Sequence, residues 1–379
     1  MMPSPPPLPT SGAPVRTSSL AIWSLVLGFF GLLVCFPAVG GLICGILALI
    51  QIGRSQEQLG GRVLAILGLV LSVAAPFVFS IGMAIIIPFL DSRAERGTHA
   101  SGSTLADARK GFVTQLIRQE KDGSPVDEPP RGVLQKVSYP SPAGELAAYL
   151  SPIPADGQKH PAIVWLFGGF SNSIGSTAWD PAPVDNDQSA AAFRSAGIVT
   201  LYPSLRGGNQ NPGYKERFLG EVEDVLAAAD FLAAQPGIDP DRIYLGGHST
   251  GGTLVLLVVE TSARFRAAFS FGPAARASDY GSDYQAHSGD TKEHQLRDPI
   301  SWLRGIRTPT FVFEGDHESA NIYSLRELEK APHHPSTRFY AVPGHTHFSL
   351  LAPYTRRIAV QIIADTGSTP HFGFSNPDK

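Results

Sequence analysis

Residues 242–252 read RIYLGGHSTGG, and this stretch decides the fold class. RIYLGG has the composition of a buried strand, and the apolar run GTLVLLVVETSA that follows is typical of a helix. Between them, residues 247–251 match the pattern GxSxG, in which small neighbours allow a sharp strand-to-helix turn that exposes a serine hydroxyl. The sequence therefore predicts a nucleophile elbow with Ser249 as the nucleophile.

Predicted strands and helices alternate on both sides of this turn. Residues 132–152 read as a β-hairpin that turns at residues 142–144. The remaining predicted strands are PAIVWLFGG, GIVTLYPSLRGG, RAAFSFGP, PTFVFEG and RFYAVPG, and RFLGEVEDVLAAADFLAA is an amphipathic helix. This alternation predicts the α/β class, an α/β-hydrolase fold over residues 131–366 with a mostly parallel sheet covered on both faces. Catalytic groups are then expected at the carboxyl ends of the strands.

Two histidines of the loop VPGHTHF are candidates for the catalytic base. His347 is favoured because it stands third after Gly344, the residue that ends the last predicted strand. His345 is the alternative, and its other interpretation is an imidazole on the loop surface. His248, next to the serine, is expected to point elsewhere and to pack or line the pocket.

The catalytic acid is expected in FEGDHES, residues 313–319. Glu318 is favoured because it stands three residues after Gly315, and Asp316, one residue after that glycine, is the alternative. Either carboxylate can hold the imidazole tautomer and stabilise the imidazolium. Glu314, which precedes the glycine, becomes the candidate only if both of the others are dispensable.

The oxyanion that forms during acyl transfer needs N–H donors already in place. The backbone amide of Thr250 is the first candidate, because it follows the nucleophile. The second is expected from the loop after LFGGF, at Gly169 or Phe170. In the alternative interpretation, the paired glycines there only form a tight strand exit.

The chain resembles the catalytic domain of the prolyl oligopeptidase family of serine peptidases and its esterase relatives. The motifs are LYPSLRGGNQNPGY, QPGIDPDRIYLGGHSTGG and PGHTHF, within residues 130–365. The resemblance implies cleavage of a small ester or amide, or of a peptide, through an acyl-enzyme without a metal or organic cofactor. It also implies that Arg206 and Tyr214 contact substrate, although Arg206 fits a structural ion pair equally well. The polar stretch 274–304 is a candidate cap over the site.

The N-terminal region is predicted to lie in a membrane. A Pro-rich tail at residues 1–18 is expected to be disordered, and residues 19–90 are expected to form two or three transmembrane segments. Two uncharged runs, 20–52 and 63–90, each exceed the roughly 20 apolar residues that span a bilayer and are too long for a signal peptide. Pro37, Pro76 and Pro88 mark expected breaks. The lipid bilayer of the cell membrane is thus a predicted partner, while the arginine count does not assign the side of the hydrolase.

The small residues within residues 18–90 resemble a Gly-rich bacterial membrane domain of unknown function. Residues 91–130 are interpreted as a linker with one amphipathic helix, whose apolar face would hold Leu105, Phe112, Leu116 and Ile117. Residues 367–379 are interpreted as a C-terminal tail.

The charge argues against a nucleic acid partner, and the positions of the cysteines argue against a disulfide or thiolate metal site in the hydrolase region. With 30 basic and 33 acidic residues, the net charge is −3, and no basic stretch suits a nucleic acid partner. Cys35 and Cys44 both lie in the apolar region, so the hydrolase region holds no internal disulfide or thiolate metal site. The prediction is a membrane-anchored serine hydrolase. The alternative is a catalytically silent hydrolase-like module that binds a ligand and reports it through the membrane helices.

Overall fold

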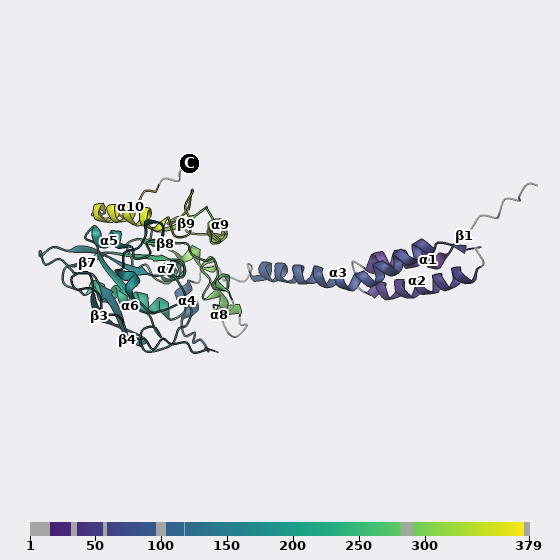
Figure 1. The fold of residues 1–379 in the computed structure, drawn as a ribbon, viewed down its shortest axis with the longest axis horizontal. Coiled ribbons are helices and arrows are strands. Elements are labelled where there is room, and N and C mark those ends of the chain that lie inside the picture. Colours follow the sequence, from purple (N-terminus) through teal and green to yellow (C-terminus); the bar gives the residue numbers. More distant parts are fainter. Residues whose placement is uncertain are drawn as a thin grey trace, which may run out of the picture. The chain divides into compact units, whose positions relative to one another are not determined.

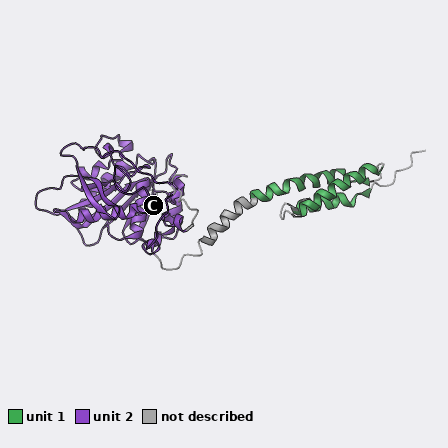
Figure 2. Cartoon of the chain, turned by 90° about the horizontal axis from the view of Figure 1, so that it is seen from below, with its two compact units in different colours: residues 1–102 green, residues 103–379 purple. Residues whose placement is uncertain are grey.

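The computed structural model of the chain contains two compact units, residues 1–102 and 103–379 (Figure 2). Each unit is described by itself. The residues that the structure describes are 16–31, 36–55, 59–95, 104–116, 118–281, 284 and 291–374. Most of the predicted N-terminal tail, the last five residues of the C-terminal tail, Cys35 and Ile117 lie outside these ranges.

The first unit is helical (Figure 1). Its elements are β1 (Arg16–Thr17), α1 (Ser19–Gly31), α2 (Phe36–Arg54), β2 (Leu59–Gly60) and α3 (Arg62–Glu95). The first expected break agrees with the structure, because α2 begins one residue before Pro37. The other two do not: α3 runs through Pro76 and Pro88 as one helix. A proline removes one backbone donor, so each of the two costs the helix a hydrogen bond without ending it.

Two stretches of this unit are long and apolar enough to cross a membrane. They are Pro37–Arg54 and Arg62–Ile81, of 18 and 20 residues, with mean hydropathies of 1.6 and 2.5. Between helices, the Ser24 hydroxyl of α1 donates to the Gly41 carbonyl of α2 at 2.9 Å. Hydrogen bonds of this kind and small residues hold apolar helices together.

The second unit is built on one eight-stranded sheet. The strands lie in the order β10-β9-β8-β7-β5-β6-β4-β3. Their bounds are β3 (Gln135–Ser141), β4 (Gly144–Leu150), β5 (His160–Leu166), β6 (Val199–Pro203), β7 (Ile238–His248), β8 (Ala268–Phe271), β9 (Thr310–Gly315) and β10 (Thr337–Val342). The β3–β4 hairpin and the β4–β6 pair are antiparallel, and the other pairs are parallel. The predicted α/β-hydrolase fold is confirmed.

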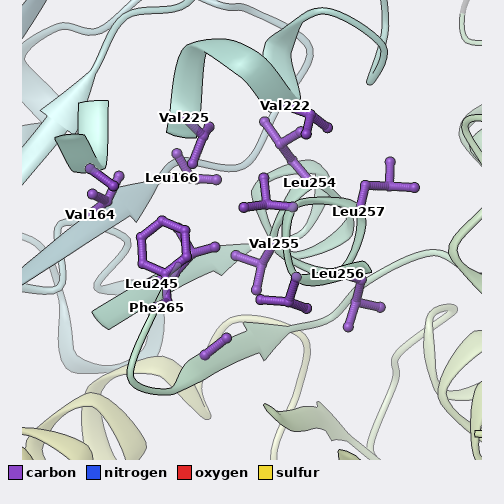
Figure 3. Packing of buried hydrophobic residues seen from close by; sticks show 14 of the residues in the cluster. Val164, Leu166, Val222, Val225, Leu245, Leu254, Val255, Leu256, Leu257 and Phe265 are labelled. Atoms are coloured by element: carbon purple, nitrogen blue, oxygen red, sulfur yellow. The ribbon is translucent and has the colours of Figure 1, made fainter. Parts of the chain in front are cut away.

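Helices cover both faces of this sheet. Along β5, Val164 and Leu166 enter one hydrophobic cluster while Ile163 and Trp165 enter the other, as the two-residue period of a strand requires. Helices α6 (Glu221–Ala233), α7 (Thr250–Thr261) and α9 (Ile322–Lys330) pack in the first cluster, and α5 (Ala191–Ser195) and α10 (Leu351–Ala364) in the second. Figure 3 shows apolar side chains of α6 and α7 meeting those of β5 and β7. The nucleophile helix α7 is thereby fixed against the middle of the sheet.

The described residues of the stretch 274–304, predicted as a cap, include four short helical segments. They are η3 (Ala277–Tyr280), α8 (Thr291–Gln295), η5 (Pro299–Ser301) and η6 (Leu303–Gly305). Two further 3₁₀ turns among the described residues are η1 (Ser176–Ala178) and η2 (Val184–Asn186).

The segment that precedes β3 packs on the hydrolase unit instead of standing apart as the predicted linker. Between residues 104 and 134, the one helix of the described part is α4 (Leu105–Arg109), which has five residues, and the backbone leaves the helical conformation at Lys110. The expected longer helix is therefore not formed, although Leu105 is fully buried in the first hydrophobic cluster. We call residues 104–122 the leading segment. Contacts with the rest of the unit, described below, hold this segment in place although it forms no longer helix.

Candidate active site

Ser249 occupies the turn between β7 and α7. Its backbone, at φ 56° and ψ −117°, belongs to neither element. Such a conformation costs about 1–3 kcal/mol and persists only where the surroundings fix it. The Ser249 amide donates to the Phe271 carbonyl of β8 at 2.7 Å. A Cβ on Gly251 would lie 2.4 Å from the Leu166 carbonyl oxygen, so only glycine lets α7 start this close to β5.

His347 pairs with the carboxylate of Glu314. The His347 Nδ1 atom lies 3.0 Å from Glu314 Oε2, and the Glu314 side chain is completely buried at the end of β9. Its other oxygen, Oε1, accepts from the Gly315 amide at 2.9 Å and the Ser319 hydroxyl at 2.8 Å. Because the carboxylate accepts the proton on Nδ1, Nε2 is left as the basic nitrogen of the ring.

The two carboxylates favoured from spacing do not reach His347. The Glu318 side chain is 78% exposed and its nearest ionic partner is His317, at 3.7 Å. Asp316 Oδ1 accepts from the Gly344 amide at 2.8 Å. The carboxylate that does reach His347 belongs to Glu314, which lies inside β9, whereas the spacing argument counted forward from Gly315 into the loop.

The serine and the His347–Glu314 pair both lie at the carboxyl ends of the parallel strands. Phe271, which accepts from the serine amide, is followed by Gly272 at φ 59°. A Cβ on Gly272 would lie 2.4 Å from His347 Cε1 and 2.5 Å from Glu314 Oε2. The backbone that anchors Ser249 therefore also borders the pair, and any side chain at residue 272 would displace it. Ser249, Glu314 and His347 follow or end three parallel strands at their carboxyl ends.

The second loop histidine lies apart from this carboxylate. His345 Nδ1 is 3.3 Å from the Ser349 hydroxyl. The structure thus brings His347, and not His345, to Glu314.

His248 is a buried neighbour of the pair. Its ring centroid lies 4.5 Å from that of His347, and its Nε2 atom is 3.0 Å from the His347 carbonyl oxygen. Nδ1 is buried without a hydrogen-bond partner. Burial, followed by the charge of His347, lowers the pKa of His248 to about 3. A ring that stays neutral and donates from Nε2 positions the backbone at His347.

The depressed pKa of His248 predicts a pH-dependent stability. The unfolded chain binds a proton at this imidazole below its ordinary pKa of 6.5, whereas the folded protein resists it down to about 3. The free energy of unfolding should therefore fall as the pH drops from 6.5 towards 3, by at most about 1.4 kcal/mol per pH unit from this group. In His248→Phe that slope should shrink, as measured by urea unfolding at pH 5 and pH 7.5. The exposed His371→Phe is the control, and equal slopes in both variants would contradict the argument.

The predicted oxyanion donors lie side by side. The Thr250 hydroxyl donates to the Gly169 carbonyl at 2.5 Å, which ties the loop after β5 to the start of α7. Thr250 is the first residue of α7, where backbone amides have no partner within the helix. Phe170 is 60% exposed, and its carbonyl accepts from the Lys215 ammonium. We call residues 167–171 the oxyanion loop.

The two residues inferred as substrate contacts have different environments. The Arg206 guanidinium is buried, with Nε and Nη2 donating to Asp224 at 3.0 and 2.9 Å and Nη1 donating to Glu216 at 2.7 Å. The guanidinium nitrogens are thus engaged in ion pairs. This agrees with the structural role that was the alternative to a substrate contact. The Tyr214 side chain is 40% exposed.

A group of aromatic side chains beside the serine was not predicted from the sequence. The buried Tyr280 hydroxyl lies 2.7 Å from Thr253 Oγ1. Burial raises the pKa of Tyr280, and hydrogen bonds with Thr253, Ala274 and the Ser249 side chain oppose that rise. The rings of Phe170, Phe218 and Tyr284 lie 6.1, 5.9 and 5.4 Å from that of Tyr280. The stretch 274–304 has no periodicity that could have indicated this cluster.

A small cavity adjoins these groups. Gly169, Thr250, Phe218 and Tyr284 are among the residues that line it, and its volume of about 40 Å³ admits water. Among the described residues, no group of three or more His, Cys, Asp or Glu side chains could hold a metal ion.

Sequence comparison places this site in a family. Residues 185–324 match the prolyl oligopeptidase family. This match lies within the hydrolase unit and includes Ser249 and Glu314. Residues 20–87 match a domain of unknown function, DUF4190. This second match covers the helical unit.

Individual relatives are similar to different extents. "Uncharacterized peptidase YtmA" of Bacillus subtilis is 26% identical over 242 residues, which cover 55% of this chain and 89% of the relative. "Polyketide transferase claH" of Penicillium crustosum is 33% identical over 138 residues, and the match covers 35% of this chain and 44% of the relative. Among solved structures, an esterase of Pyrobaculum calidifontis covers 62% of this chain and 87% of its own, with 18% identity and a TM-score of 0.45. The prolyl oligopeptidase family match and the peptidase relative make this chain a hydrolase.

Proposed function

We propose that this chain is a membrane-anchored serine hydrolase that cleaves an ester or amide bond through an acyl-enzyme. The proposal depends most on one observation: Ser249 sits on a strained turn at the sheet edge where the buried Glu314 carboxylate binds His347 Nδ1. A serine, an imidazole and a buried carboxylate in this arrangement supply a nucleophile, a base and a group that orients the base.

In the proposed reaction, the Ser249 oxygen attacks the substrate carbonyl carbon while His347 Nε2 takes the hydroxyl proton. Glu314 holds the ring and stabilises the imidazolium that results. The tetrahedral intermediate collapses, the bond to the leaving group breaks, and His347 gives its proton to the leaving alcohol or amine. Water then attacks the acyl-enzyme by the same steps and regenerates the serine.

The negative charge on the substrate oxygen needs donors that are fixed before the reaction. We assign the amide of Thr250 and an amide at Gly169 or Phe170 to this role. The hydrogen bond from the Thr250 hydroxyl to the Gly169 carbonyl supports the assignment, because it fixes the two backbone segments relative to one another. Tyr214 remains a proposed substrate contact on the exposed surface.

The membrane anchor is the less direct part of the proposal. It is supported by two apolar helices of sufficient length and by the match of residues 20–87 to a domain of unknown function. Partition of the full chain into the membrane fraction, resistant to carbonate extraction, is the corresponding measurement. Release of the chain by carbonate would remove the anchor from the proposal.

Fluorophosphonate labelling tests the enzymatic part directly, because only an activated serine reacts with the probe. We expect the full chain in detergent to be labelled, with the adduct mapped by mass spectrometry to Ser249. Hydrolysis of p-nitrophenyl esters and aminoacyl amides by the same preparation identifies the preferred bond. Ser195→Ala, at an exposed serine of α5, should label like the wild type. A folded chain that neither labels nor hydrolyses any of these substrates would favour a silent ligand-binding module.

A further inference from the structure

The loop that follows Tyr214 has a conformation that needs support. We call residues 214–219 the wall loop. Its residues Arg217 and Phe218 have φ angles of 55° and 74°, in the left-handed region that side chains with a Cβ disfavour. Such a residue is retained only where surrounding contacts hold it. Two of these contacts come from the leading segment.

Arg109 supplies the first contact. Its partly buried guanidinium donates to the carbonyls of Phe218 and Leu219 at 2.8 and 3.0 Å. The same group donates to the Leu296 carbonyl at 2.6 Å, which joins the wall loop to the end of α8. Burial, followed by the charge of Arg297, lowers the pKa of Arg109 to about 10, so the group stays charged at neutral pH. A charged donor strengthens hydrogen bonds to neutral carbonyls.

Glu120 supplies the second contact. Its carboxylate lies 2.9 Å from Arg217 Nη2 and 3.8 Å from Lys215 Nζ. Its backbone carbonyl accepts from the Lys215 amide at 3.0 Å. Arg217 and Lys215 are both nearly buried, so solvent screens these interactions less than it would on an open surface.

The wall loop in turn contacts the groups assigned to catalysis. The Lys215 ammonium donates to the Phe170 carbonyl of the oxyanion loop and lies 4.7 Å from the centre of the Tyr284 ring. The Phe218 ring packs 5.9 Å from that of Tyr280, whose hydroxyl is beside Ser249. A shift of the wall loop would therefore move an oxyanion donor and the aromatic residues next to the nucleophile.

We propose that Arg109 and Glu120 are positioning residues of the candidate active site. Through them, the leading segment holds the wall loop, and the wall loop holds the oxyanion loop. This inference rests on the proposed serine hydrolase function. It assigns a part in activity to the stretch of chain that directly precedes the catalytic domain and that contains none of the reacting groups.

Steady-state kinetics of the full chain in detergent tests the inference. In Arg109→Ala and Glu120→Gln, we expect kcat to fall about tenfold or more with KM changed by less than about threefold, because a misplaced donor is felt mainly in the transition state. The rate of fluorophosphonate labelling should fall in parallel. Arg109→Lys should recover part of the loss, since an ammonium can bond one or two of the three carbonyls.

Two matched variants separate positioning from loss of charge. Lys110→Ala removes the neighbouring, exposed cation, and Glu128→Gln removes a 76% exposed carboxylate that pairs with Lys136 away from the wall loop. Both should keep wild-type kcat. Wild-type kcat in folded Arg109→Ala and Glu120→Gln, or equal losses in the two controls, would overturn the inference.

Folding and the underlying function are checked in the same experiment. Thermal unfolding is measured for each variant, and if Arg109→Ala does not fold, Glu120→Gln decides the matter, because its carboxylate is partly exposed. If the wild type is labelled and the Arg109→Ala and Glu120→Gln variants keep full activity, only the positioning role is refuted. An unlabelled wild type refutes the proposed function and this inference with it.

Discussion

Ser249→Ala should lose at least about 10⁴-fold in kcat on any ester that the wild type cleaves, because the variant has no nucleophile and retains only binding and the oxyanion donors. Fluorophosphonate labelling should disappear with it. The substitution keeps Cβ on a turn that is fixed by backbone bonds, such as that of the Ser249 amide to the Phe271 carbonyl, so the fold should persist. Residual turnover on a single ester, measured against a blank preparation, gives the size of the effect.

Ser195→Ala provides the comparison, since it removes a hydroxyl from the surface of α5. Its thermal midpoint and kcat should both match the wild type. A Ser249→Ala protein that turns over at a rate near the wild type would end the assignment of the nucleophile. The reactive group would then have to be sought outside the elbow.

Glu314→Gln should reduce kcat by about 10³- to 10⁴-fold, with little change in KM. An amide at this position cannot stabilise the imidazolium, and its NH₂ group favours the tautomer that leaves His347 Nδ1 without a proton. The effect follows from the 3.0 Å contact between Glu314 Oε2 and His347 Nδ1. Measuring kcat and KM separately shows whether the loss lies in the chemical step.

Glu318→Gln and Asp316→Asn are the matched carboxylate variants. The Glu318 side chain is largely exposed, so the Glu318→Gln variant should keep nearly wild-type activity. Asp316→Asn should be mild, because an amide oxygen can still accept from the Gly344 amide. If Glu318→Gln alone were strongly impaired, the loop would have to rearrange in the working enzyme. Equal mild losses in all three variants would point to a Ser-His dyad.

The sequence predicted the elbow and the sheet well because their signals are local. A strand, the turn residue Ser249 and an apolar helix lie consecutively in the chain, and they fold into neighbouring positions. The same holds for the hairpin of β3 and β4, whose turn residues stand between the two strands. Local order of this kind needs no knowledge of distant contacts.

The pairing of His347 with Glu314 could not be read from spacing. A count from Gly315 assumes that the acid stands in the loop after the strand, whereas Glu314 lies inside β9. Which residue faces the histidine depends on where the loop after β10 lies, and the local sequence around Gly315 does not specify that. Tyr280 and the contacts of the leading segment were missed for the related reason that their partners are far away along the chain.

That separation has a consequence for how the protein is made. Arg109 leaves the ribosome long before Leu296, the carbonyl partner that lies 187 residues further along the chain. Domains generally fold as units, and contacts between distant residues need the closure of a long loop. The set of carbonyls that the Arg109 guanidinium binds is therefore complete only after Leu296 has been translated. The proposed site also needs His347, so a nascent chain that stops before residue 347 carries an unfinished site.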